Sequence, residues 1–172
     1  MHKNETVGVE IERKYIIKMP SILLIKGQSN YTESEILQIY LPSEKGETRR
    51  IRRRVYGDKT LCTETKKMRI DGMSATEIER EISLAEFDEL ALSIKQGTTP
   101  VNKTRYTFIS EGQLFEIDVY PQWKRTAIME TELENREAKV KIPDFLEILR
   151  EVTGDKSYSN AAMSRDFPPE DI

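Results

Sequence analysis

Charged side chains that alternate with other residues are the groups in this chain best suited to chemistry. The alternation places these groups on common faces: Glu10, Glu12 and Lys14; Arg50, Arg52 and Arg54; Glu64 and Lys66; Glu77, Glu79 and Glu81; Lys103 and Arg105; Glu116 and Asp118; Glu130, Glu132 and Glu134. A period of two is typical of a β-strand, whose successive side chains point to opposite faces. Carboxylates hold divalent cations, whereas arginines and lysines hold phosphate oxygens. Brought together, such faces would form a phosphoryl-transfer site.

The same pattern also fits the solvated face of an ordinary antiparallel sheet that packs on helices through its other face. The pattern taken alone favours this interpretation, because solvated strand faces are common. The segregation of sign argues against it, since a solvated face usually mixes charges so that cross-strand pairs form. Three arginines on one strand face, Arg50, Arg52 and Arg54, repel one another unless acidic neighbours or an anion offset their charge.

Length and composition predict one domain over residues 1–172. The chain carries 27 lysines and arginines against 30 aspartates and glutamates, which gives a net charge of −3. This near-balance argues against a disordered polyanion and against a general nucleic-acid coat, because both need one sign of charge to dominate. The sequence has neither an apolar run long enough to cross a membrane nor a signal-like core, so we expect a cytoplasmic protein with no membrane partner.

Two residue types narrow the chemistry further. Cys62 is the only cysteine, which excludes an internal disulfide and a thiolate-rich zinc site. His2 is the only histidine and lies near the N-terminus, which argues against a His-based triad, metal site or acid–base relay. An enzyme of this composition would work with carboxylates, amines and guanidiniums.

The elements that must position these residues are mostly strands. Eight are predicted, over 7–17, 34–42, 47–56, 59–67, 74–82, 99–110, 113–120 and 126–134. Tight antiparallel turns are expected at Gly57-Asp58 and Glu111-Gly112, because glycine supplies the positive φ that such turns need. Eight strands are enough to close a barrel, whose interior can hold a ligand.

Three helices are expected between and after these strands. The clearest spans 84–95, where Ser83 and Glu86 form a capping-box pattern. A second is predicted over 143–153, opening with a proline and stopping at a glycine. A short helix is expected within 20–27, and the sequence after residue 154 has little periodicity.

In chain order, the charged motifs resemble those of CYTH-domain proteins, also called triphosphate tunnel metalloenzymes. The matching elements are Glu10-Ile11-Glu12-Arg13-Lys14, Gln38-Ile39-Tyr40-Leu41, Arg50-Ile51-Arg52, Thr65-Lys66, Glu79-Arg80-Glu81, Lys103-Thr104-Arg105-Tyr106, Glu116-Ile117-Asp118-Val119-Tyr120, Glu130-Thr131-Glu132-Leu133 and Lys156 to Asn160. The first is similar to the family's Glu-x-Glu-x-Lys signature, and the resemblance covers about residues 7–163.

The resemblance implies a fold and a class of reaction. The fold is α+β and mainly β, an eight-stranded antiparallel β-barrel that forms a tunnel, with helices packed outside. The family's reactions act on triphosphates: hydrolysis of tripolyphosphate, thiamine triphosphate or nucleoside triphosphates, RNA 5′-triphosphate processing, or cyclisation of ATP. The charged faces would then line the tunnel, and Val9, Ile11 and Tyr15 would lie on the face that helices cover.

The motifs also imply roles for single residues. Mg²⁺ or Mn²⁺ would be held by carboxylates drawn from Glu10, Glu12, Glu79, Glu81, Glu116, Asp118, Glu130 and Glu132, because hard oxygen ligands suit hard cations. Glu10, Glu12 and Lys14 would form the catalytic centre. The triphosphate would be bound by Arg50, Arg52, Lys66, Lys103, Arg105 and Lys156. Positioning and charge neutralisation would supply most of the catalysis.

Some of these residues have a plain structural alternative. Glu79 and Glu81 also fit ion-pair partners that keep the neighbouring arginines apart. Glu77 and Glu134 lie at strand ends, where surface charges are expected. Aromatic residues could stack on a nucleobase, but packing is the commoner role for Tyr40, Tyr106 and Trp123.

The sequence thus predicts a metal-dependent triphosphatase that acts on inorganic tripolyphosphate or on a nucleoside or other organic triphosphate. An adenylyl cyclase that makes cyclic AMP and a non-catalytic polyphosphate- or nucleotide-binding tunnel stay open as alternatives. The small triphosphate substrate is the expected partner, and duplex nucleic acid is not, because the acidic strands oppose it. We expect a monomer or a homodimer.

Overall fold

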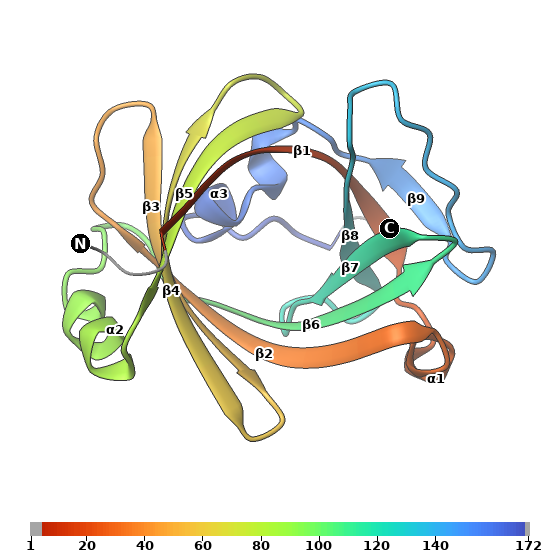
Figure 1. Ribbon diagram of the computed structural model, residues 1–172, viewed down its shortest axis with the longest axis horizontal. Coiled ribbons are helices and arrows are strands. Elements are labelled where there is room, and N and C mark those ends of the chain that lie inside the picture. The colour runs from red at the N-terminus through yellow and green to blue at the C-terminus, as the bar shows by residue number, and fades with distance from the viewer. Residues whose placement is uncertain (1–4, 171–172) are drawn as a thin grey trace.

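The computed structural model describes residues 5–170, and their strands form one antiparallel sheet that closes on itself (Figure 1). The strands are β1 (Glu5–Lys18), β2 (Ser29–Leu41), β3 (Glu47–Tyr56), β4 (Lys59–Arg69), β5 (Ser74–Ile82), β6 (Val101–Ser110), β7 (Gln113–Val119), β8 (Thr126–Glu132) and β9 (Ile148–Glu151). Their order is β5-β4-β3-β2-β6-β7-β8-β1-β9, and pairing of β5 with β1 closes the ring. The predicted eight-stranded barrel, β1 to β8, is confirmed. His2 lies outside the described residues.

Strand β1 closes the barrel because its two halves pair with different strands. Residues Glu5–Ile11 pair with β5, whereas Glu12–Lys18 pair with β8. The short strand β9 continues on the β5 side, next to Tyr15–Ile17. The even-numbered residues of β1 from Glu10 to Lys14 face the barrel interior, as the alternation predicts.

The hairpin between β3 and β4 has the predicted two-residue turn. Gly57 has a φ of 58°, which an L side chain rarely adopts, and Tyr56 pairs with Lys59 across the turn. The turn therefore fixes the register of the whole hairpin, which sets the side chains of β4 that face the interior.

The helices are α1 (Ile22–Lys26), α2 (Leu84–Ala91) and α3 (Asn160–Met163), and the single turn η1 (Lys156–Tyr158) precedes α3. Helix α2 begins where predicted, with the Ser83 hydroxyl accepting from the Glu86 N–H at 3.0 Å. Its Phe87 packs on Leu41 and Ile51 against the outside of the barrel. No helix within residues 5–170 has both the length and the apolar character needed to span a membrane.

The helix predicted over 143–153 is wrong, because residues 148–151 form β9 instead. The second half of β1 has a backbone edge that β5 does not reach, and β9 pairs with that edge. The helical spacing of apolar residues here is misleading: Leu146 is buried, but Ile148 and Leu149 are 36% and 40% exposed. Pairing with a distant strand outweighs the local pattern.

One end of the barrel interior is filled by apolar side chains. Ile16, Tyr40, Tyr120 and Trp123 form a buried cluster there with Met163 of α3. Figure 1 shows α3 within the outline of the ring of strands. Turn η1 and helix α3 help to wall this end of the interior.

Candidate active site

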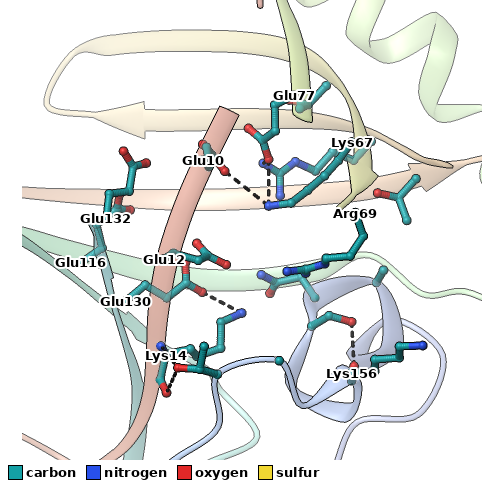
Figure 2. A pocket seen from close by; sticks show the side chains of 18 of the residues that line it. Glu10, Glu12, Lys14, Lys67, Arg69, Glu77, Glu116, Glu130, Glu132 and Lys156 are labelled. Carbon is teal, nitrogen blue, oxygen red and sulfur yellow. Dashed lines mark hydrogen bonds and ion pairs between the residues drawn. The ribbon is translucent and has the colours of Figure 1, made fainter. Parts of the chain in front are cut away.

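The remaining interior of the barrel is a cavity of about 850 Å³ that carries most of the predicted site (Figure 2). Residues of all the strands from β1 to β8 line it, and the segment from 152 to 162 closes one side. Eleven predicted residues line this cavity: Glu10, Glu12, Lys14, Arg50, Arg52, Glu79, Arg105, Glu116, Glu130, Glu132 and Lys156. The barrel thus brings together both acidic and basic strands that lie far apart in the sequence.

Three carboxylates, Glu10, Glu12 and Glu132, form the acidic group of the cavity, and they crowd one another. Glu12 lies directly opposite Glu132 on the neighbouring strand. Burial, followed by repulsion from Glu77, raises the pKa of Glu10 to about 7. Burial also raises the pKa of Glu12, with help from Glu130, and that of Glu132, with help from Glu116. The acidic group lacks enough positive charge to keep its members readily ionised.

A second set of residues, the paired network, neutralises itself. Arg105 Nε donates to Asp118 Oδ1 at 2.6 Å, and Lys103 Nζ donates to Asp118 Oδ2 at 2.6 Å. Lys14 Nζ lies 3.1 Å from Glu130 Oε1, and Arg105 also pairs with Glu116. Although burial opposes ionisation, Lys14 and Arg105 lower the pKa of Glu130 to about 2. Burial lowers the pKa of Lys103 to about 7, against the attraction of Asp118. The hydrogen bonds and ion pairs hold the network in place before any ligand arrives.

Two arginines of β3, Arg50 and Arg52, face the cavity. Arg52 donates to Gln38 Oε1 from Nε and Nη2, at 3.1 and 2.9 Å. Burial and the neighbouring charges of Arg50 and Arg105 lower the pKa of Arg52 to about 9. The Nε of Arg50 is buried and has no hydrogen-bond partner among residues 5–170. Buried donors of this kind are expected to bind an anion.

Lys67 links the basic and the acidic sides of the cavity. Its Nζ lies 2.9 Å from Glu77 Oε1 and 3.3 Å from Glu10 Oε2 (Figure 2). Burial alone would raise the pKa of Glu77, but the positive charges of Arg50 and Lys67 outweigh burial and lower this pKa. The expectation that Glu77 is a surface charge is therefore wrong, and Glu77 instead holds Lys67 and faces Arg50.

The lysine of β4 was predicted one residue too early. Lys66 points outward and is exposed, whereas Lys67 and Arg69 line the cavity. The signal was present in the sequence: a two-residue turn at Gly57-Asp58 pairs Arg50 with Thr65. Thr65 shares the inner face with Arg50, so the next inward residue is Lys67.

Three further predicted residues do not reach the cavity. Lys103 and Asp118 lie beneath its wall, with side chains 0% and 1% exposed. Both Asp118 oxygens already accept from Lys103 or Arg105, so this carboxylate supports Arg105 and is not free to hold a metal. Glu81 is exposed at the end of β5 and is not part of the lining.

Glu79 lies on the basic side, away from the acidic group. Its Oε2 accepts from the Thr65 hydroxyl at 2.8 Å, and its charge acts on Arg50 and Arg52. This placement favours the alternative in which Glu79 offsets the repulsion between the arginines.

The aromatic residues serve packing. Trp123 is 3% exposed within the apolar cluster, and Tyr106 stacks on Tyr31 with ring centroids 6.5 Å apart. Tyr40 borders the cavity but is 6% exposed. Among the residues that line the cavity in the described chain, Tyr40 is the only aromatic one.

A divalent cation fits the chemistry of the acidic group. Residues 5–170 contain no ready-made cluster of three Asp, Glu, His or Cys side chains that could hold a metal ion. The carboxylates of Glu10, Glu12 and Glu132 nevertheless share one face and offer hard oxygen donors, and burial together with neighbouring carboxylates raises the pKa of each. Rotation of their side chains is needed to bring them around one ion.

Solved structures with the same architecture were found. Two crystal structures of the protein NE1496 match with a TM-score of 0.56. One is described as an inorganic triphosphatase, with 26% identity over 94% of this chain and 97% of that chain. The other, described as a hypothetical protein, has 27% identity over 92% of this chain and 99% of that chain. PH1012 from Pyrococcus horikoshii OT3 matches at a TM-score of 0.55, with 19% identity over 74% of this chain and 81% of its own.

No protein-family model matches the sequence, and no curated protein matches it significantly. The structural matches confirm the resemblance read from the charged motifs, since the chain has the tunnel fold of the CYTH family.

Proposed function

We propose that this protein is a metal-dependent triphosphatase that hydrolyses a phosphoanhydride bond of a triphosphate inside the barrel. The observation that carries the proposal is a single cavity with inward-facing arginines, including the unpartnered Nε of Arg50, on one side and carboxylates with raised pKa values on the other. A triphosphate chain with its divalent ion satisfies both sides at once. The 26% identity to NE1496, described as an inorganic triphosphatase, supports hydrolysis over mere binding.

The basic side would hold the phosphate oxygens. Arg50 and Arg52 offer guanidinium donors from β3, and Lys67 and Arg69 add charge from β4. Lys156 adds a further amine at the exposed turn η1. Arg105, held rigidly by Asp118, needs no rearrangement when the substrate enters.

Mg²⁺ or Mn²⁺ would be held by Glu10, Glu12 and Glu132, with Glu116 and Glu130 as further oxygen donors from the adjacent strands. The bound ion would supply neutralisation of phosphate charge and a more acidic water. Lys14 keeps Glu130 ionised and oriented next to Glu12, which makes it a positioning residue.

Phosphate release tests the proposal directly. We expect release from inorganic tripolyphosphate, ATP or thiamine triphosphate that requires Mg²⁺ or Mn²⁺, stops with a chelator, and is lost in the Glu10→Gln variant. Glu81→Gln is the matched control, because Glu81 lies outside the cavity. Tight triphosphate binding without release would support the non-catalytic tunnel, and formation of cyclic AMP from ATP would support the cyclase.

A further inference from the structure

The N-terminal half of β1 leaves one of its two backbone edges unpaired. Strand β5 pairs with Glu5–Ile11 on one side. On the other side β8 pairs with Glu12–Lys18 and does not extend to the residues before Glu12. The last bond on the β8 side runs from Leu133 N–H to Ile11 C=O at 2.7 Å. Backbone groups alternate in direction along a strand, so the N–H and C=O of Val7 and Val9 point the same way as those of Ile11. Within residues 5–170 no strand meets them there.

The same two valines also expose their side chains on the outside of the barrel. Val7 is 67% and Val9 63% exposed, which corrects the expectation that helices cover Val9. Ile78 of β5 lies directly opposite Val7, and Met68 of β4, 46% exposed, lies one strand further along the same face. An open strand edge beside an uncovered apolar strip is a surface suited to pairing with another strand.

We propose that a second copy of this chain pairs here, β1 against β1, antiparallel about a two-fold axis through Gly8. In this register Val7 lies opposite Val9 of the partner subunit, and each N–H meets a C=O. Gly8 lies opposite Gly8 of the partner subunit at a non-hydrogen-bonded position, where the two Cα atoms come within about 4.5 Å. Glycine suits this closest approach. The four valines then cover one another.

The register follows from the facing residues. With the axis at Gly8, Thr6 faces Glu10 of the partner subunit, so no like charges oppose each other. An axis at Glu10 would place two carboxylates opposite each other. An axis at Val9 would place Val7 opposite Ile11 of the partner subunit, whose carbonyl already accepts from Leu133, so a pair next to the centre of the ladder would lose a bond. With the axis at Gly8, Ile11 meets only Glu5 of the partner subunit, at the end of the paired stretch.

The pairing would also extend the wall of the cavity. Thr6, Val7 and Gly8 border the cavity at the point where β8 has ended. The partner strand runs antiparallel to β1 on the β8 side, and therefore continues the line of β8 beside the acidic group. This inference rests on the strand edge and does not depend on the proposed function.

The mass of the whole chain in solution, measured by sedimentation and with no tag added before β1, tests whether the dimer forms. We expect the mass to rise from 20.0 kDa toward twice that value with concentration. The Val9→Lys variant should raise the dimer dissociation constant by at least about tenfold, because burial of a valine side chain contributes that much. Leu92→Lys is the matched control, since Leu92 is 85% exposed after α2 and should leave the dimer intact. A mass of one chain at every attainable concentration would overturn the proposal.

A cysteine pair tests the register. Gly8→Cys should form a disulfide with its own copy under mild oxidation, because nothing lies within 4 Å of a Cβ built at Gly8 and the two positions face each other. Thr6→Cys should not, because Thr6 faces Glu10 of the partner subunit. Cys62 is buried and gives little background. A dimer in which both variants cross-link equally, or neither does, would refute the pairing through Gly8.

Discussion

The acidic group lines the cavity and the paired network lies in and beneath its wall, yet the surroundings shift the pKa values of their carboxyls in opposite directions. In the paired network, Arg105 and Lys103 hold Asp118, and the pKa of Asp118 is lowered although burial alone would raise it. In the acidic group, burial and neighbouring carboxylates raise the pKa of Glu10 to about 7. The first region is neutralised within the protein, whereas the second keeps raised pKa values that a bound cation would lower. The difference separates residues that build the site from residues that receive a ligand.

Removing the centre of the paired network should have the largest effect. Asp118→Asn leaves two buried cations without their carboxylate, so we expect the free energy of unfolding to fall by about 3–5 kcal/mol. Urea denaturation measures this change. Glu81→Gln, an exposed carboxylate at the end of β5, should change stability by less than about 0.5 kcal/mol. Equal effects of the two variants would mean that the network is no more important than a surface charge.

Removing a member of the acidic group should act on cation binding and spare stability. Glu12→Gln takes away a carboxylate that lies opposite Glu132, so the unfolding free energy should stay constant or rise. Affinity for Mn²⁺, followed by calorimetry, should fall by more than about tenfold, because an anionic oxygen donor is lost. A loss of stability with unchanged Mn²⁺ affinity would contradict the distinction between the two regions.

The two neighbouring lysines of β4 sharpen the comparison on the basic side. Lys67→Ala should raise the KM for tripolyphosphate by about tenfold, because a half-buried amine that lines the cavity is lost. Lys66→Ala, on the outer face, should change it by less than about twofold. Steady-state kinetics on both variants decides the matter, and a larger effect at Lys66 would mean that the register of β4 is wrong.

The pH dependence of stability should show the smallest effect, and its sign distinguishes the regions. A carboxyl whose pKa is raised in the folded state contributes stability below about pH 4.5, and this contribution is lost as the pH rises through about 7, as for Glu10. The pKa of Glu130 is lowered to about 2, so its contribution is present above about pH 4.5 and is lost in acid.

Thermal unfolding between pH 5 and pH 8, with and without Mg²⁺, measures the Glu10 contribution. The metal-free protein should lose stability as the pH rises, and the loss should shrink both in Glu10→Gln and with Mg²⁺ present. A metal-free stability that rises steadily through pH 7 would mean that the acidic group is already neutralised within the protein.

The sequence by itself determined the eight strands of the barrel and most of their inward faces. Alternation with a period of two is a local property, so it correctly assigned Glu10 and Glu12 on β1, and Arg50 and Arg52 on β3, to the interior. The turn at Gly57 also sets the register of β3 and β4, which places Lys67 on the inner face. The motif resemblance alone assigns this role to Lys66.

Only the tertiary structure decided which charges meet. Asp118 and Glu132 have the same local pattern, yet Asp118 lies between two buried cations and Glu132 lies opposite Glu12. The helix predicted over 143–153 failed for the same reason, because an unpaired edge of β1 draws residues 148–151 into β9. Strand neighbours come from closure of the whole barrel, and a charge acquires its pKa and its role from those neighbours across the sheet.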